Sequence, residues 1–247
     1  FERAADLVEL ALPDLRRNRQ DAALLGWLKS LPDALLQCRP VLSANYGGVL
    51  LASGELEAVE ERLQDAEQWL DMTADRGQQP EAPTGERVVV DEEAFRLLPG
   101  SIAVWRAGLA LVLGDVTDTV KYARLALELV PENDHLGQGG AAGLLGLAYW
   151  TSGELESAHR TFAEGMGTVQ KAGHVSDTIS GAIALADIRV AQGRLHEAMR
   201  TYENASQLAL EQREPLLRGT ADLHVGISEL HLEHNDLHAA EQHLLRS

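Results

Sequence analysis

The side chains whose type and spacing could most readily support chemistry are histidines near the C-terminal end of the chain. Imidazole nitrogens are common zinc ligands, and four histidines follow one another at short spacing: His231, His234, His238 and His243. His224 lies seven residues before the first of them, so the two would share one face of a helix. The Asn235-Asp236 turn, however, interrupts the four-residue step within the group. A zinc site needs convergent ligands and partners that orient them, so we interpret these histidines as surface or core-edge residues and predict no metal site.

No motif in the sequence indicates a catalytic centre. Serine, histidine and aspartate occur as in any chain of this size, but no G-x-S-x-G elbow frames a nucleophile. The sequence also has no G-x-x-x-x-G-K-[ST] loop, which a nucleotide phosphate site of that type would need. We therefore predict that this segment is not an enzyme and that it holds no cofactor.

The charge balance of the chain argues against nucleic acid as a direct partner. The formal net charge is −17, and the densest basic pair is Arg16-Arg17. Nucleic-acid binding needs a basic patch that replaces phosphate counterions, whereas an acidic surface suits a cationic partner. With Cys38 as the one cysteine and no apolar run of membrane-spanning length, we expect a reducing, cytoplasmic location and no membrane partner. The chain starts at Phe1 and stops inside a repeat, so we expect both ends to be cut.

The elements that must position any functional side chain are visible in residues 141–162, AAGLLGLAYWTSGELESAHRTF. Gly146 would let a second helix approach closely. Gly153 would end the first helix, because glycine adopts the left-handed backbone conformation without strain. Ala158 and Phe162 then follow on one face of a second helix. This spacing is typical of a tetratricopeptide (TPR) helix pair, which needs neighbouring pairs to bury its apolar face.

Copies of this unit recur along the chain. Their turn residues are Gly54, Gly114, Gly193 and Asn235, asparagine being the next most suitable residue after glycine. From Gly114 onward the turns are separated by 39, 40 and 42 residues, and the separation of 60 between Gly54 and Gly114 indicates an insertion. We predict an all-α, TPR-like helical-repeat superhelix (α-solenoid) of about five to six helix pairs. A simple helical bundle is the alternative, but a bundle does not require a turn glycine at a fixed offset.

The predicted solenoid fills residues 1–247 as a single domain with four parts. Residues 1–40 form an opening helical unit, with a first helix bent or interrupted at Pro13 and a second ending before Pro32. Residues 41–72 form the first repeat, and residues 73–99 read as a flexible insertion whose end could form a short helix. Residues 100–247 hold four further repeats. The β-like run at 88–90 is too short to found a sheet.

The inner surface of such a solenoid is the expected binding surface, because the first helix of each pair lines it. Carboxylates and tryptophans suit a polyhydroxylated ligand such as a sugar, and they suit a cationic ligand or basic peptide equally well. The tryptophans and the acidic stripe each have a structural alternative: the tryptophans would pack between repeats, and the acidic stripe would be a solvated face. Alignment on the turn residue selects eight candidates for effector or partner binding: Asn45, Trp105, Trp150, Ser180, Asp187, Asp222, Glu229 and Glu233.

One stretch before the first repeat is similar to a known family. Trp27-Leu28, Leu31-Pro32, Leu35-Leu36 and Arg39-Pro40 form a W-L-x-x-L-P-x-x-L-L-x-x-R-P run. This run resembles the segment that follows the ATPase module in MalT-type regulators, the ATP-dependent transcription activators of the LuxR family. The later segments LALELVPEN and NDLHAAEQHL resemble repeats of the same family.

The resemblance implies a sensor domain. In such regulators an upstream module binds ATP and a C-terminal helix-turn-helix reads DNA, while the solenoid binds an effector that controls self-association. This sequence has neither a phosphate loop nor a basic recognition helix, so the resemblance implies that those modules are absent from this chain. The partner would be a small-molecule effector, a peptide or a protein, and self-association is possible. A general TPR scaffold that binds a peptide or protein partner is the alternative function.

Overall fold

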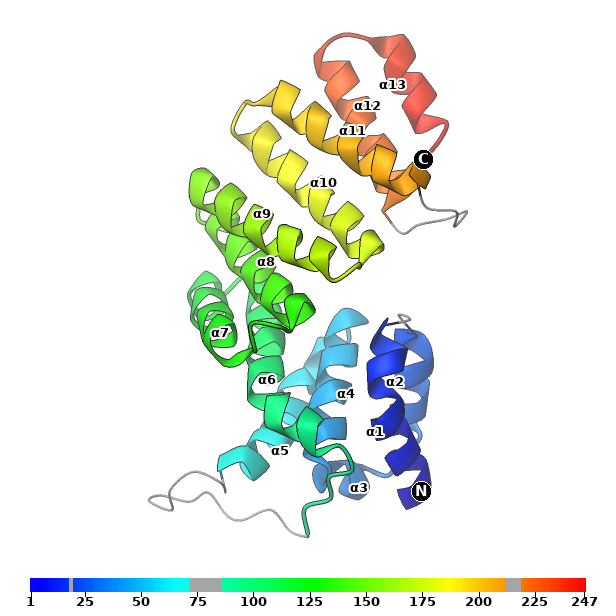
Figure 1. Ribbon diagram of the computed structural model, residues 1–247, viewed down its shortest axis with the longest axis vertical. Coiled ribbons are helices and arrows are strands. Elements are labelled where there is room, and N and C mark those ends of the chain that lie inside the picture. Colours follow the sequence, from blue (N-terminus) through cyan, green and yellow to red (C-terminus); the bar gives the residue numbers. More distant parts are fainter. Residues whose placement is uncertain (18–19, 72–85, 212–218) are drawn as a thin grey trace.

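The computed structural model describes residues 1–17, 20–71, 86–211 and 219–247, and within them the chain is helical without strands. The all-α prediction is therefore confirmed (Figure 1). The helices are α1 (Glu2–Arg17), α2 (Asp21–Lys29), α3 (Asp33–Gln37), α4 (Pro40–Ala52), the 3-10 helix η1 (Leu56–Ala58), α5 (Val59–Asp71), α6 (Glu92–Val112), α7 (Val116–Leu129), α8 (His135–Thr151), α9 (Leu155–Lys171), α10 (Val175–Ala191), α11 (Leu195–Glu211), α12 (Thr220–Glu233) and α13 (Leu237–Leu244).

Five successive helix pairs, from α4–α5 to α12–α13, are each joined by a turn that needs a left-handed residue. The backbone angle φ at these turns is 76° at Gly54, 78° at Gly114, 80° at Gly153, 73° at Gly193 and 57° at Asn235. All five predicted turn residues therefore adopt the expected conformation. A left-handed conformation at each turn lets the chain reverse direction directly after the first helix.

Close helix packing inside the third pair depends on Gly146. A Cβ atom on this residue of α8 would lie 2.7 Å from the Cβ and 2.9 Å from the backbone nitrogen of Phe162 in α9. Phe162 is 5 % exposed and belongs to a buried cluster with Ala158 and Ile188. The absent side chain thus lets the α9 backbone seat directly on α8, as the sequence predicted.

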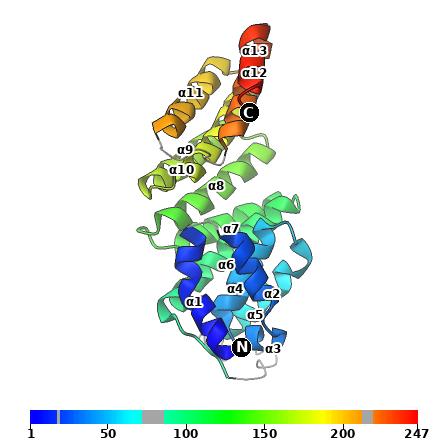
Figure 2. The same ribbon diagram turned by 90° about the vertical axis from the view of Figure 1, so that its right-hand side faces the viewer.

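Helix pairs stack into an elongated molecule, with α1 at one end and α13 at the other (Figure 2). Successive first helices contact each other, α4 with α6, α6 with α8 and α10 with α12, whereas the second helices contact mainly their own partners and the following first helix. The core is accordingly a series of small apolar clusters rather than one large centre. The first helices form the inner row, in which α8 and α10 are joined mainly through α9, and the candidate residues lie on this row.

The opening unit folds around the run that carried the family resemblance. Leu28, Leu31 and Leu36 are buried in one apolar cluster with residues of α1. Arg39 is 4 % exposed, and its Nη2 lies 2.6 Å from the Asp6 carboxylate. The spacing of this run therefore has a packing explanation, since it places three leucines and one arginine against α1.

The second repeat begins earlier than predicted, because α6 starts at Glu92 and Pro99 lies inside it. Residues 92–99 thus belong to a 21-residue helix rather than to an insertion. The preceding segment is tied to the opening unit: Glu9 Oε1 accepts hydrogen bonds from the backbone N–H groups of Val90, at 2.8 Å, and Asp91, at 3.1 Å. Residues 72–85, to which most of the predicted flexible insertion corresponds, lie outside the described residues.

By length and composition alone, α6 is long and apolar enough to cross a membrane, although no such run was expected from the sequence. Its most apolar window has a mean hydropathy of 1.3. In the fold this helix packs against α4, α7 and α8, and Leu98, Ile102 and Ala107 are buried there. The apolar character of α6 is accounted for by its place between neighbouring repeats.

Candidate functional site

Two of the eight candidate residues lie together on the inner row at the junction of α10, α11 and α12. Asp187 of α10 accepts a 2.7 Å hydrogen bond from the Tyr202 hydroxyl of α11. Tyr202 is 2 % exposed, and a Cβ on Gly226 of α12 would lie 2.4 Å from its hydroxyl oxygen. Burial, then the hydrogen bond and charge of Asp187, and then the charge of Glu229 raise the pKa of Tyr202 above its ordinary value. The hydroxyl therefore remains a neutral donor that orients Asp187, while Glu229 adds a second carboxylate nearby.

The predicted acidic stripe is present on α12 as an exposed surface. Asp222, Glu229 and Glu233 are all exposed, and their spacing of seven and four residues places them on one face of the helix. Val225 and Leu232 interrupt the carboxylates and are 37 % and 49 % exposed. The stripe is therefore amphipathic, since it offers acceptors and negative charge beside apolar side chains.

Three further candidates differ in how far they are buried. Ser180 of α10 is exposed, and its hydroxyl would lie 3.2 Å from a Cβ on Gly219. Asn45 of α4 is 8 % exposed and donates a 2.8 Å hydrogen bond to the Val41 carbonyl of its own helix. Trp150 is half-buried against the apolar cluster between α9 and α10.

Trp105 of α6 lies against a neighbouring glycine. A Cβ on Gly48 of α4 would approach the Trp105 indole to 2.5 Å, and the Arg16 guanidinium of α1 lies 5.6 Å from the centre of the ring. Asn45 and Trp105 thus lie on α4 and α6, at the other end of the stack from Asp222, Glu229 and Glu233 (Figure 1). The eight candidates do not form one site; the compact group consists of Asp187 and Glu229 around Tyr202.

The histidines make contacts that the sequence did not reveal. The Nδ1 atoms of His224 in α12 and His243 in α13 lie 3.2 Å apart, and the His231 ring centre is 5.6 Å from that of His243. No group of three or more potential ligands suited to a metal ion is found in the part of the chain that the structure describes. Spacing showed that His224 and His231 share a face, but only the pairing of α12 with α13 could place His243 against them.

Known proteins share the fold and, over much of the chain, the family. A solved structure titled "Crystal structure of BtubC (BKLC) from P. vanneervenii" aligns with a TM-score of 0.61 over 99 % of this chain and 88 % of that one, at 16 % identity, so the likeness is one of fold. No curated protein matches the sequence. The family model described as "MalT-like TPR region" matches residues 100–247, from within α6 to the last residue. This match covers more than half of the chain and the last four helix pairs, so the protein belongs to the MalT-like TPR family.

Proposed function

We propose that this chain is the effector-sensing and interaction domain of a bacterial transcription activator. The observation that supports this role is the match of residues 100–247 to the MalT-like TPR family, together with the resemblance of residues 27–40 to the segment that precedes the repeats in such regulators. In this proposal the chain binds an effector or partner on its inner row. Binding then controls self-association and DNA binding of the full-length regulator, whose nucleotide- and DNA-binding functions belong to other modules.

The group around Tyr202 defines the chemistry that such an effector would meet. Asp187 is held by the Tyr202 hydroxyl, so its second carboxylate oxygen has a fixed position from which to accept a hydrogen bond. Glu229 is exposed on the neighbouring first helix. Two carboxylates on adjacent inner helices suit a ligand rich in hydroxyl donors or one that carries a positive charge. A ligand that bridges α10 and α12 would also fix the angle between two repeats.

Thermal-shift screening of the chain against sugars, amino acids and small metabolites would test the proposal. A ligand that binds only the folded state raises the melting temperature. We expect Asp187→Asn to reduce that shift, because the substitution removes the charge without changing the size of the side chain. Glu203→Gln is the matched control, since Glu203 is an exposed carboxylate on α11. If both variants, or neither, lose the shift, the inner-row site is wrong.

A general TPR scaffold that binds a peptide is the second candidate. The observation that favours it is the alternation of exposed Val225 and Leu232 with the carboxylates of α12, since an amphipathic cationic helix could lie on such a face. The two functions differ in what accompanies the solenoid. If the complete reading frame encodes a phosphate loop before this segment and a helix-turn-helix after it, the regulator is supported; if it encodes neither, the scaffold is.

A further inference from the structure

Helix α13 is attached to the described part of the molecule through a small surface. Among the described helices, it makes extensive contact with α12 alone. Ala240 is the one buried residue of α13, and Ala239 and His243 are half-buried, whereas the other residues of this helix are exposed. Its two leucines, Leu237 and Leu244, are 63 % and 49 % exposed. Two alanines bury little apolar surface, so His243 is the largest side chain of α13 that is mostly covered by α12.

His243 contacts two other imidazole rings, both on α12. Its Nδ1 lies 3.2 Å from Nδ1 of His224, and the centres of these two rings are 5.2 Å apart. Its ring centre is also 5.6 Å from that of His231. The two rings of α12 are seven residues apart and share one face of the helix. The three side chains, called the imidazole cluster below, therefore form the polar part of the surface on which α13 docks.

The hydrogen bond within the imidazole cluster exists only in some protonation states. In a neutral imidazole one ring nitrogen donates and the other accepts, whereas in an imidazolium both nitrogens donate. His224 and His243 can therefore share a proton between their Nδ1 atoms as long as no more than one ring is charged. When both rings are charged, two N–H donors face each other across 3.2 Å. Repulsion between like charges then replaces the hydrogen bond that joins the two helices.

The surroundings of the cluster oppose its protonation. Burial is the largest cause that lowers the pKa of His224 and the pKa of His243 below the ordinary value, and the charge of Arg246 lowers both further. The charges of His224 and His231 also lower the pKa of His243. The described residues of α10 and α11, which pack against α12 as well, contribute no charge that shifts the pKa of either ring.

The lowered pKa values fix the direction in which pH acts on the docking of α13. Asp236 Oδ2 lies 3.9 Å from Nδ1 of His231, so this carboxylate faces the ring outside the hydrogen-bonded pair. The released helix leaves His224 and His243 in water, where they bind protons more readily than in the docked state. Docking is therefore strongest above about pH 6.5, and it weakens as the pH falls below that value.

We propose that α13 is a proton-sensitive helix, which the neutral imidazole cluster docks on α12 near neutral pH and which is released when His224 and His243 both take up a proton. Release uncovers the face of α12 that carries His224 and His231. It also separates Ala240 from its packing partner, so α13 has no buried side chain left to hold it among the described residues. This device needs no ligand, and it does not depend on the function proposed for the inner row.

Hydrogen–deuterium exchange of the whole chain, followed by mass spectrometry, tests the release. Labelling times at each pH are scaled for the intrinsic exchange rate, and α9 serves as the internal reference. If the released state binds one proton more than the docked state, the protection of the α13 amides should fall about tenfold between about pH 6 and pH 5. The protection of α9 should not change. An unchanged ratio of the two protections, including an equal loss in both helices, would overturn the proposal.

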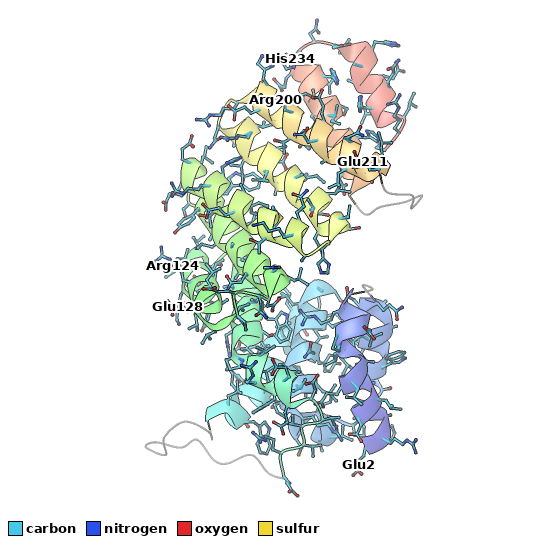
Figure 3. All side chains as sticks on the ribbon, in the orientation of Figure 1. Glu2, Arg124, Glu128, Arg200, Glu211 and His234 are labelled. Carbon is cyan, nitrogen blue, oxygen red and sulfur yellow. The ribbon has the colours of Figure 1, made fainter. Side chains whose placement is uncertain are left out.

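Substitutions on α13 separate the imidazole cluster from histidine in general. His243→Gln removes the titrating group but retains a donor and an acceptor, so the protection of α13 should become nearly independent of pH. His238→Gln is the matched control, because His238 is exposed on the same helix. His243→Arg places a permanent charge in the cluster and should release α13 at neutral pH, whereas His238→Arg should not. His234 is left unchanged, since it lies at the turn end of α12 (Figure 3), stacked on His196 of α11.

Direct titration of the rings keeps the test decisive even if His243→Gln leaves α13 undocked at every pH. The NMR signals of the imidazole C–H protons report the protonation of His224 and His243 in the unmodified chain. Their titration should coincide with the loss of protection in α13. Titration of both rings at a pH where α13 stays protected would overturn the proposal. Retention of the original pH dependence in His243→Gln, or equal release by His243→Arg and His238→Arg, would overturn it as well.

Discussion

Adding one methyl group at Gly146 should separate the packing requirement of the repeat from the general effect of glycine in a helix. The new Cβ would lie 2.7 Å from the Phe162 Cβ and 2.9 Å from its backbone nitrogen. Backbone atoms cannot rotate away, so α9 would have to shift as a unit. Overpacking of this kind costs about 1–3 kcal/mol. Glycine in a helix interior is itself about 1 kcal/mol less favourable than alanine, so the two effects oppose each other in Gly146→Ala.

Gly140→Ala is the matched control, because it isolates the second effect. Gly140 lies in the same helix, and a Cβ there would meet no atom within 4 Å. We expect Gly140→Ala to raise the free energy of unfolding by up to about 1 kcal/mol. The free energy of unfolding of Gly146→Ala should be lower than that of Gly140→Ala by the overpacking cost of about 1–3 kcal/mol.

Urea denaturation followed by circular dichroism gives both free energies of unfolding and their slopes. A difference in midpoint at constant slope reports a change in stability. If Gly146→Ala proves as stable as Gly140→Ala, then α8 and α9 do not approach as closely as the structure shows, and the explanation for this glycine is refuted.

Further predictions concern the turn, the histidines and the anchor of the opening unit. Asn235→Ala should lower the free energy of unfolding by about 1 kcal/mol in thermal melts, because alanine is strained in the left-handed conformation. Asn235→Gly should not lower it, and equal stability of the two variants would contradict this explanation. Burial lowers the pKa of His224 and His243, and the charge of Arg246 lowers both further. The unfolded chain therefore takes up protons first, and stability should fall as pH drops below about 6.5; the urea midpoint of His243→Gln should depend less on pH, and an unchanged pH profile would exclude this pair. Glu9→Leu should cost about 2 kcal/mol in urea denaturation because it leaves two backbone N–H groups without their acceptor, and Glu9→Gln, which retains an acceptor oxygen, should cost less.

The repeat architecture could be predicted from the sequence because its signals are local. Gly153 and Asn235 each mark a turn through a backbone conformation that few residues adopt, and the spacing to Phe162 follows from helical periodicity. The start of the second repeat was harder to place, because Pro99 suggested a boundary. In the fold this proline is tolerated seven residues into α6, where the helix packs against its neighbours.

The candidate site was predictable only in part, because it depends on contacts between helices. Alignment on the turn placed Asp187 and Glu229 on successive first helices, but it could not show that Tyr202 orients Asp187. Asn45 illustrates the opposite case: its position in the repeat is one that can face inward, yet its amide bonds to its own helix.

The contacts between successive helix pairs also determine how the molecule deforms. In the part of the chain that the structure describes, successive first helices contact each other at three of the four junctions between pairs, and at every junction the second helix contacts the following first helix. Contacts between successive second helices are sparse there. A change of angle between two pairs therefore has to move a second helix across the next first helix. The stack consequently resists bending as well as stretching, because both deformations disturb the same contacts.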